Sequence, residues 1–155
     1  MCKMCNVVNN YITLGGNNMT NKNEIYLKVK LAEHLDCDIE DIEQGYDEST
    51  FELGNQEYLL LTDEEADQRA EEYIKDSIWA FVPSFLAKHT GLDEEIIKHL
   101  QDKCEGANDV LLNSIKDIDS FISNAIGCDG RGHFMCTYDD QEQEIDDNLF
   151  LYRIN

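Results

Sequence analysis

The stretch EYLLLTDEEADQRAEEYIKD, residues 57–76, predicts a strand that runs directly into a helix. Its first part, 57–62, favours β-structure, and an earlier run at 50–53 does the same. The Gly-Asn-Gln segment at 54–56 separates the two runs and is typical of a hairpin turn. Because a two-stranded hairpin is only marginally stable alone, we expect the helix that follows to cover it.

The start of this helix is marked by Thr62, whose hydroxyl can cap the first turn, and by a carboxylate three residues later at Glu65. Apolar side chains then recur three and four residues apart, which places them on one stripe facing the core. The stripe comprises Ala66, Ala70, Tyr73, Ile74, Ser77, Ile78 and Phe81. The opposite face is therefore acidic and displays Glu64, Glu65, Glu71, Glu72 and Asp76, with Asp67 at its edge.

Helical spacing predicts three further helices, at 25–35, 93–104 and 108–126. Pro83 should end or kink the helix that begins after Thr62, and a short apolar segment follows it. The predicted core stripe of the last helix comprises Val110, Leu111, Ile115, Ile118, Phe121, Ile122 and Ala125.

The remaining segments are predicted as a loop and a second hairpin. Residues 36–49 are acidic and are expected to form a loop with one helical turn. Two β-like runs, 133–138 and 149–154, are joined by an acidic connection at 139–147. Together these elements predict an α+β fold, in which three or four helices pack on a small antiparallel sheet made of two hairpins.

Length and composition predict one folded domain. The chain has 155 residues, of which 42% are hydrophobic, enough for a single core. We expect residues 1–23 to be a flexible Cys- and Asn-rich leader and 24–155 to be a single acidic α+β domain. No apolar stretch reaches the roughly twenty residues that a membrane-spanning helix needs, and no signal peptide is evident, so we expect a cytoplasmic protein that does not bind membranes.

Charge is the strongest functional signal in the sequence. The formal net charge is −21, and residues 33–76 contain seventeen carboxylate side chains against the two cations Arg69 and Lys75. Such a chain repels nucleic-acid phosphates and anionic membranes but is attracted to strongly basic protein surfaces. The expected partner is a basic nucleic-acid-binding protein, with no direct binding of nucleic acid. The alternatives are an ordinary solvated helix face and adaptation to high salt.

Metal binding and catalysis have weaker support. A zinc site could combine the pair Cys2 and Cys5 with Cys128, His133 and Cys136, but the spacing lacks a second tight pair of ligands, and free thiols are the simpler interpretation. The chain contains neither a Gly-x-Ser-x-Gly elbow nor a phosphate-binding glycine loop. We therefore predict no metal site, no cofactor and no enzymatic activity.

Two stretches carry a family resemblance. The run 57–67, EYLLLTDEEAD, and the ending from DGRGHF at 129–134 to YRIN at 152–155 resemble a family of small acidic proteins from bacteriophages and mobile elements. The resemblance covers about the last hundred residues. Two departures limit it, because Asp140 stands where a glycine is expected and the leader has no counterpart. The resemblance implies a phage setting, in the cytoplasm of a bacterial host, and no catalytic residues.

Charge and resemblance together predict an inhibitor of a host DNA-targeting defence nuclease, either a CRISPR or a restriction enzyme, that acts by resembling DNA. Ten carboxylates are expected to bind the partner: Glu64, Glu65, Asp67, Glu71, Glu72, Asp76, Asp139, Asp140, Glu142 and Glu144. They would pair with cations that otherwise hold phosphates. The alternatives are a phage adaptor that binds a host protein through an apolar patch, and a small zinc-binding regulator. The sequence leaves the oligomeric state open.

Overall fold

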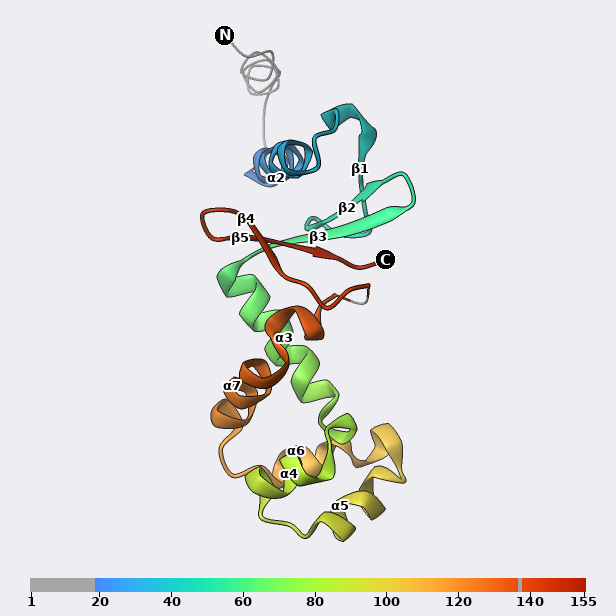
Figure 1. The fold of residues 1–155 in the computed structure, drawn as a ribbon, viewed down its shortest axis with the longest axis vertical. Helices are drawn as coiled ribbons and strands as arrows, with labels where there is room; N and C mark the ends of the chain where they lie inside the picture. Colours follow the sequence, from blue (N-terminus) through green and yellow to red (C-terminus); the bar gives the residue numbers. More distant parts are fainter. Residues whose placement is uncertain (1–18, 137) are drawn as a thin grey trace. The chain divides into compact units, whose positions relative to one another are not determined.

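The computed structural model describes residues 19–136 and 138–155, and the chain divides into two compact units, Met1–Leu60 and Leu61–Asn155 (Figure 1). The described ranges contain six α-helices and five strands. The predicted α+β class is therefore confirmed, while the single domain over 24–155 stays a prediction. Most of the predicted leader lies outside the described residues, but helix α2 (Met19–Leu35) begins within it.

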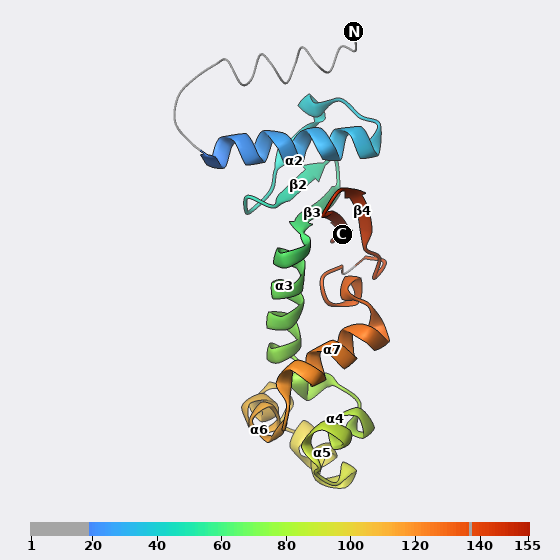
Figure 2. The ribbon, with the colours of Figure 1, turned by 90° about the vertical axis from the view of Figure 1, so that its left-hand side faces the viewer.

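The first unit combines α2 with three strands. Leu27, Leu31 and Ala32 are buried and lie within two turns of one helix face. Figures 1 and 2 both place α2 against the strands of this unit. The helix predicted at 25–35 is confirmed, and it begins six residues earlier than expected.

Strands β1 (Ile42–Gln44), β2 (Thr50–Leu53) and β3 (Gln56–Thr62) pair antiparallel in succession. The β2–β3 hairpin is the one that the sequence predicts. Phe51 lies opposite Tyr58, and both are buried. Gly54 has a φ of +63°, a conformation that glycine adopts without steric cost, and this closes the turn.

Strand β1 corrects the prediction of a loop over 36–49. The expected helical turn is present as the 3₁₀ turn η1 (Ile39–Asp41), but the chain then becomes extended. Ile42 is only 3% exposed and lies opposite Leu53. The side-chain amide of Gln44 donates to the carbonyl of Thr50 at 2.9 Å and so closes the connection to β2. A strand of three residues is too short to show a period in the sequence.

Helix α3 (Asp63–Asp76) begins in the second unit where the sequence predicts it. The backbone N–H of Glu65 donates to the Thr62 hydroxyl at 3.3 Å, and the Glu65 carboxylate accepts from the Thr62 N–H at 2.9 Å. This reciprocal pair is the expected capping box.

The end of α3 differs from the prediction, because the helix stops at Asp76, well before Pro83, and is followed by the 3₁₀ turn η2 (Ile78–Ala80). A long-range contact explains the early end. The Asn108 amide donates to the Lys75 carbonyl at 2.7 Å and accepts from the Trp79 N–H at 3.1 Å. One side chain thus replaces the hydrogen bonds that another helical turn would supply.

Four short helices follow: α4 (Pro83–Thr90), α5 (Glu94–Gln101), α6 (Asn108–Ser114) and α7 (Ile118–Asp129), with the 3₁₀ turn η3 (Cys104–Ala107) before α6. The single helix predicted over 108–126 is wrong, because Ile115 is extended with a ψ of 128°. The carboxylate of Asp117 caps α7 by accepting from the Ser120 N–H at 3.0 Å. Val110, expected in the core, is 51% exposed.

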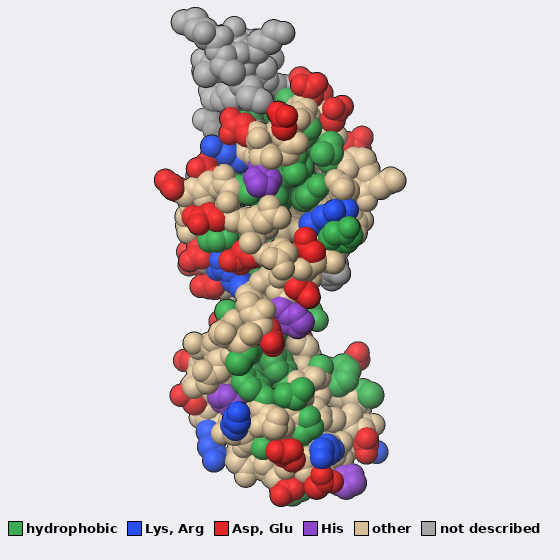
Figure 3. Space-filling view, viewed as in Figure 1, with side chains coloured by type: hydrophobic (Ala, Val, Ile, Leu, Met, Phe, Trp, Pro, Cys, Tyr) green, Lys and Arg blue, Asp and Glu red, His purple; other side chains and the backbone are tan. Residues whose placement is uncertain are grey.

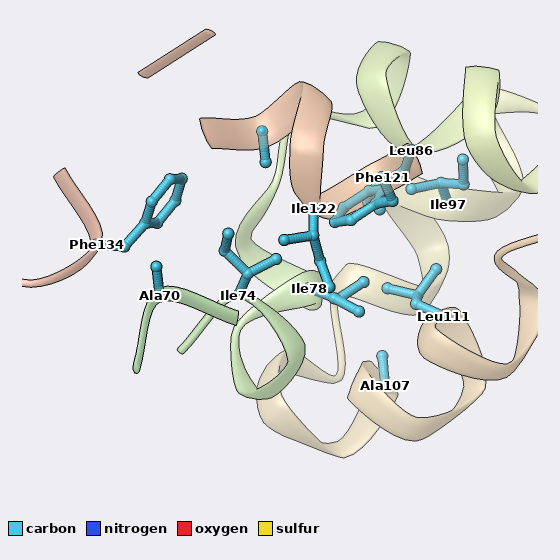
Figure 4. Packing of buried hydrophobic residues seen from close by; sticks show 11 residues of the cluster. Ala70, Ile74, Ile78, Leu86, Ile97, Ala107, Leu111, Phe121, Ile122 and Phe134 are labelled. Atoms are coloured by element: carbon cyan, nitrogen blue, oxygen red, sulfur yellow. The ribbon is translucent and has the colours of Figure 1, made fainter. Parts of the chain in front are cut away.

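The main buried cluster of the second unit is formed by side chains from its helices and 3₁₀ turns (Figure 4). Ile74 of α3, Ile97 of α5, Leu111 of α6 and Phe121 of α7 are each 0% exposed. Apolar burial of this kind is the main favourable term in folding. The cluster fixes α3 and α7 beside each other, which matters for the surface described below.

The carboxyl-terminal hairpin is formed by β4 (Gln143–Asp146) and β5 (Leu149–Arg153). The strand predicted at 133–138 is wrong, because the 3₁₀ turn η4 (Arg131–Phe134) occupies its start. The Cys136 N–H donates to the Gly132 carbonyl at 2.7 Å, which keeps this segment turned. An ideal Cβ on Gly132 would lie 2.7 Å from the Asp140 carbonyl oxygen, so glycine permits this close approach.

Candidate partner-binding face

The second unit carries most of the charge. Residues 61–155 include 22 Asp and Glu side chains against eight Lys and Arg. All ten predicted partner-binding carboxylates lie in this unit, six on α3 and four in the segment 139–144. On the face that Figure 3 shows, hydrophobic side chains gather over the helices of this unit, and acidic, basic and histidine side chains lie around them.

Arg131 joins the two predicted groups of carboxylates. Its Nη1 donates to the carboxylates of Asp63 at 2.7 Å and Asp67 at 2.8 Å, and its Nε donates to Glu142 at 2.6 Å. Its side chain is only 9% exposed. The structure therefore brings Asp67 of α3 together with Glu142 of the acidic connection. We call Arg131 and these three carboxylates, together with Tyr152, the Arg131 junction.

Tyr152 completes the junction from β5. Its buried hydroxyl donates to the Glu142 carboxylate at 2.5 Å. Burial, followed by the hydrogen bond to Glu142, raises the pKa of Tyr152 well above its ordinary value. Burial alone would lower the pKa of Arg131, but its hydrogen bonds to Glu142, Asp63 and Asp67 outweigh burial and raise it. Arg131 is thus firmly cationic and Tyr152 firmly neutral.

Several predicted partner-binding residues have roles within the fold. Glu65 is part of the capping box of α3, Glu71 pairs with Lys75, and Glu72 accepts from the Gln68 amide at 3.2 Å. Such contacts between exposed side chains on one helix are weak and can rearrange. They leave Glu71 and Glu72 able to meet an external cation, whereas Glu65 caps α3 and Asp67 and Glu142 are held in the junction.

The segment 139–144 is ordered by its own contacts. The Cys136 thiol donates to Asp139 at 3.0 Å, and the Gln141 N–H donates to the same carboxylate at 3.0 Å. The thiol contact and then the N–H contact lower the pKa of Asp139. Asp140 lies 3.5 Å from the imidazole of His133, which is half exposed.

The remaining predicted residues lie open to solvent. Glu64, Asp76 and Glu144 are exposed, and within the described ranges their side chains make no hydrogen bond or ion pair. They are the predicted carboxylates best able to accept cations from a partner.

Sequence reasoning missed a groove between α3 and α7. Asp67 and Glu71 of α3 face Asp119, Ile122, Ser123 and Ile126 of α7 across an open hollow of about 330 Å³. We call this surface the α3–α7 groove. The Asp117–Ser120 cap was the available signal, because it places Asp119 in the first turn of a separate helix.

Cys128, His133 and Cys136, the described members of the alternative zinc site, do not form a metal-binding group. Among residues 19–136 and 138–155, no group of three or more His, Cys, Asp or Glu side chains could hold a metal ion. Cys136 is buried and its thiol contacts the Arg153 carbonyl and Asp139, whereas Cys128 is exposed. Cys2 and Cys5 lie outside the described residues.

A run of aromatic rings crosses the same unit. Phe81 lies 5.1 Å from Phe121 and 6.3 Å from Phe134, between ring centroids, and Tyr73 lies 6.2 Å from Phe134. Tyr73 is 54% exposed, and Val82, the residue after Phe81, is 63% exposed, so apolar side chains of this region reach the surface. No helix within the described ranges has the length and apolar character needed to cross a membrane.

Comparison of the chain with protein-family models, with curated proteins and with solved structures found no match.

Proposed function

We propose that this chain is a phage-encoded inhibitor that binds the basic DNA-binding surface of a host defence nuclease of the CRISPR or restriction type. The observation that carries the proposal is the concentration of carboxylates in the second unit, where α3 and the segment 139–144 meet at the Arg131 junction. The phage setting comes from the resemblance of 57–67 and 129–155 to small acidic phage proteins. Catalysis has no part in this function.

The proposed mechanism is competition for the cations that hold DNA phosphates. From Glu64 to Asp76, α3 extends about 18 Å along its axis at 1.5 Å per residue. Its exposed carboxylates are carried on a capped helix, so little backbone freedom is lost on binding. Lysine and arginine side chains in a DNA-binding groove can pair with these carboxylates as they do with phosphates.

The contacts divide eight of the ten candidate carboxylates into two roles. Asp67 and Glu142 hold Arg131, and Glu65 caps α3, so these three position the face. Glu64, Glu72, Asp76, Asp140 and Glu144 are exposed and are proposed to contact the partner.

The test is displacement of a labelled DNA duplex from purified restriction and CRISPR nucleases, followed by fluorescence anisotropy. We expect the chain to displace the duplex, with an affinity that falls steeply as salt rises. A triple variant, Glu64→Lys, Glu72→Lys and Asp76→Lys, should lose displacement. A matched variant that reverses Asp102, Glu105 and Asp109, three exposed residues remote from α3 in sequence, changes the net charge equally and should retain it. Equal loss in both variants would exclude a specific face.

The second candidate function is an adaptor that binds a host protein through an apolar patch. The exposure of Tyr73 and Val82 beside the aromatic run favours it. An adaptor would keep its partner at high salt and tolerate the triple reversal on α3. It would instead lose binding when Tyr73 and Val82 are replaced by serine.

A further inference from the structure

The α3–α7 groove has a mixed lining that is unusual on so acidic a surface. Ile122 and Ile126 supply apolar side chains from α7, and Ser123 supplies a hydroxyl. The carboxylates of Asp67 and Glu71 come from α3, and that of Asp119 comes from α7. The groove is therefore apolar in part and is flanked by carboxylates from two helices.

This lining excludes several kinds of ligand on physical grounds. An anion would be repelled by three carboxylates, and a purely apolar group would remove the unpaired carboxylate of Asp119 from water without a hydrogen-bonding partner. A long side chain with an aliphatic stem and a cationic tip satisfies both parts, because the stem covers apolar surface while the tip stays with the carboxylates.

The carboxylates around the groove keep an excess of negative charge after their internal pairs are counted. Arg131 contacts Asp63, Asp67 and Glu142, and Lys75 pairs with Glu71. Asp119 is exposed and makes no ion pair or side-chain hydrogen bond in the part of the chain that the structure describes. Four carboxylates thus share two cations, and Asp119, which has neither, is the one best placed to accept a third.

We propose that the α3–α7 groove binds an arginine side chain of the basic partner. The arginine stem lies on Ile122 and Ile126, and its guanidinium donates to Asp119 and to the α3 carboxylates. Arginine fits better than lysine because its planar guanidinium offers several donors to carboxylates on two sides. This inference rests on the proposed function, in that the partner is a basic protein, and it names the contact that the groove contributes.

The test uses a hexa-arginine peptide and a hexa-citrulline peptide, which is its neutral counterpart. We expect hexa-arginine to shift the side-chain methyl NMR signals of Ile122 and Ile126 in a saturable way, and hexa-citrulline to leave them in place. Asp119→Asn should weaken hexa-arginine binding roughly tenfold, as expected for one hydrogen bond between charged groups. Asp109→Asn is the matched control, because Asp109 also lies in the first turn of its helix, α6, and is exposed. Circular dichroism of both variants checks that they fold.

Two results would overturn the proposal that the groove binds arginine. One is a shift of signals on the outer face of α3 with Ile122 and Ile126 unmoved, and the other is equal weakening by Asp119→Asn and Asp109→Asn. The proposed function fails separately. If the chain does not displace duplex DNA from any nuclease but the two isoleucine signals still respond to hexa-arginine, the groove stands and the nuclease proposal falls. If the α3 triple reversal abolishes displacement while Asp119→Asn behaves like Asp109→Asn, the nuclease proposal stands and the groove falls.

Discussion

Replacing Arg131 by alanine is expected to destabilise the second unit by about 2 to 3 kcal/mol. The side chain donates to Asp63, Asp67 and Glu142 at distances between 2.6 and 2.8 Å. A hydrogen bond to a charged group contributes roughly 1.5 to 3 kcal/mol when it is shielded from water, and an exposed ion pair contributes roughly 0 to 1 kcal/mol.

Exposure decides which of these contacts dominates. The Asp63 and Asp67 side chains are 52% and 66% exposed, so water replaces most of the hydrogen bonding that they lose with Arg131. The Glu142 side chain is 27% exposed and also accepts from the Tyr152 hydroxyl, so the loss of its contact with Arg131 accounts for the larger share of the destabilisation. The Arg131 guanidinium also lies 4.6 Å from the centre of the Phe150 ring, and this packing is lost as well.

The measurement is urea unfolding followed by the fluorescence of Trp79, the single tryptophan, which lies half-buried in the second unit. Lys103→Ala is the control, because it removes the same charge from an exposed position. Arg131→Lys keeps the charge without the planar donors and should recover about half of the loss. Equal unfolding free energies for Arg131→Ala and Lys103→Ala would refute the structural role of the junction.

Three further changes test other contacts. Asn108→Ala should cost about 1 to 3 kcal/mol, because it leaves the Trp79 N–H and Lys75 carbonyl without their partner, and the same urea assay measures it. The fold raises the pKa of Tyr152, so the stability that its neutral hydroxyl contributes is complete below its ordinary pKa of about 10 and is lost as pH rises above that value. Tyr152→Phe should therefore reduce the loss of stability at alkaline pH, as measured by thermal unfolding at successive pH values. Gly132→Ala should destabilise the fold by about 1 to 3 kcal/mol, because the added Cβ meets the Asp140 carbonyl. Its control is Gly127→Ala in α7, where the added Cβ meets open space, so this variant should be neutral or stabilising by up to about 1 kcal/mol. Thermal unfolding of the two variants measures the difference.

Local signals predicted the parts of the fold that depend on neighbouring residues. The capping box at Thr62 and Glu65 and the hairpin around Gly54 are confirmed, because the sequence itself supplies the groups that satisfy the backbone. The early end of α3 could not be foreseen in this way. It depends on Asn108, which lies 33 residues from Lys75 and is brought there by the helical core.

The break between α6 and α7 shows how two signals can compete. The apolar stripe from Leu111 to Ala125 continues through the break, so periodicity favours one helix. The Asp117–Ser120 cap and the hydrogen bond from the Lys116 N–H to the His89 carbonyl favour two helices. Tertiary contacts decide the outcome, and the turn they produce creates the wall of the α3–α7 groove.

The carboxylates illustrate the same limit for function. Their number and their place on α3 follow from composition and helical spacing, and these were sufficient to suggest a basic partner. Their division into roles was not readable, because Arg131 lies 64 residues from Asp67 and only the fold brings them within 2.8 Å. Arg131, whose side chain is 9% exposed among three carboxylates, neutralises part of the negative charge at one end of the face and holds those carboxylates in place. The acidic surface is therefore a positioned set of carboxylates, in which some hold the arrangement and others, such as Glu64, Asp76 and Asp119, lie exposed and are the ones proposed to contact a partner.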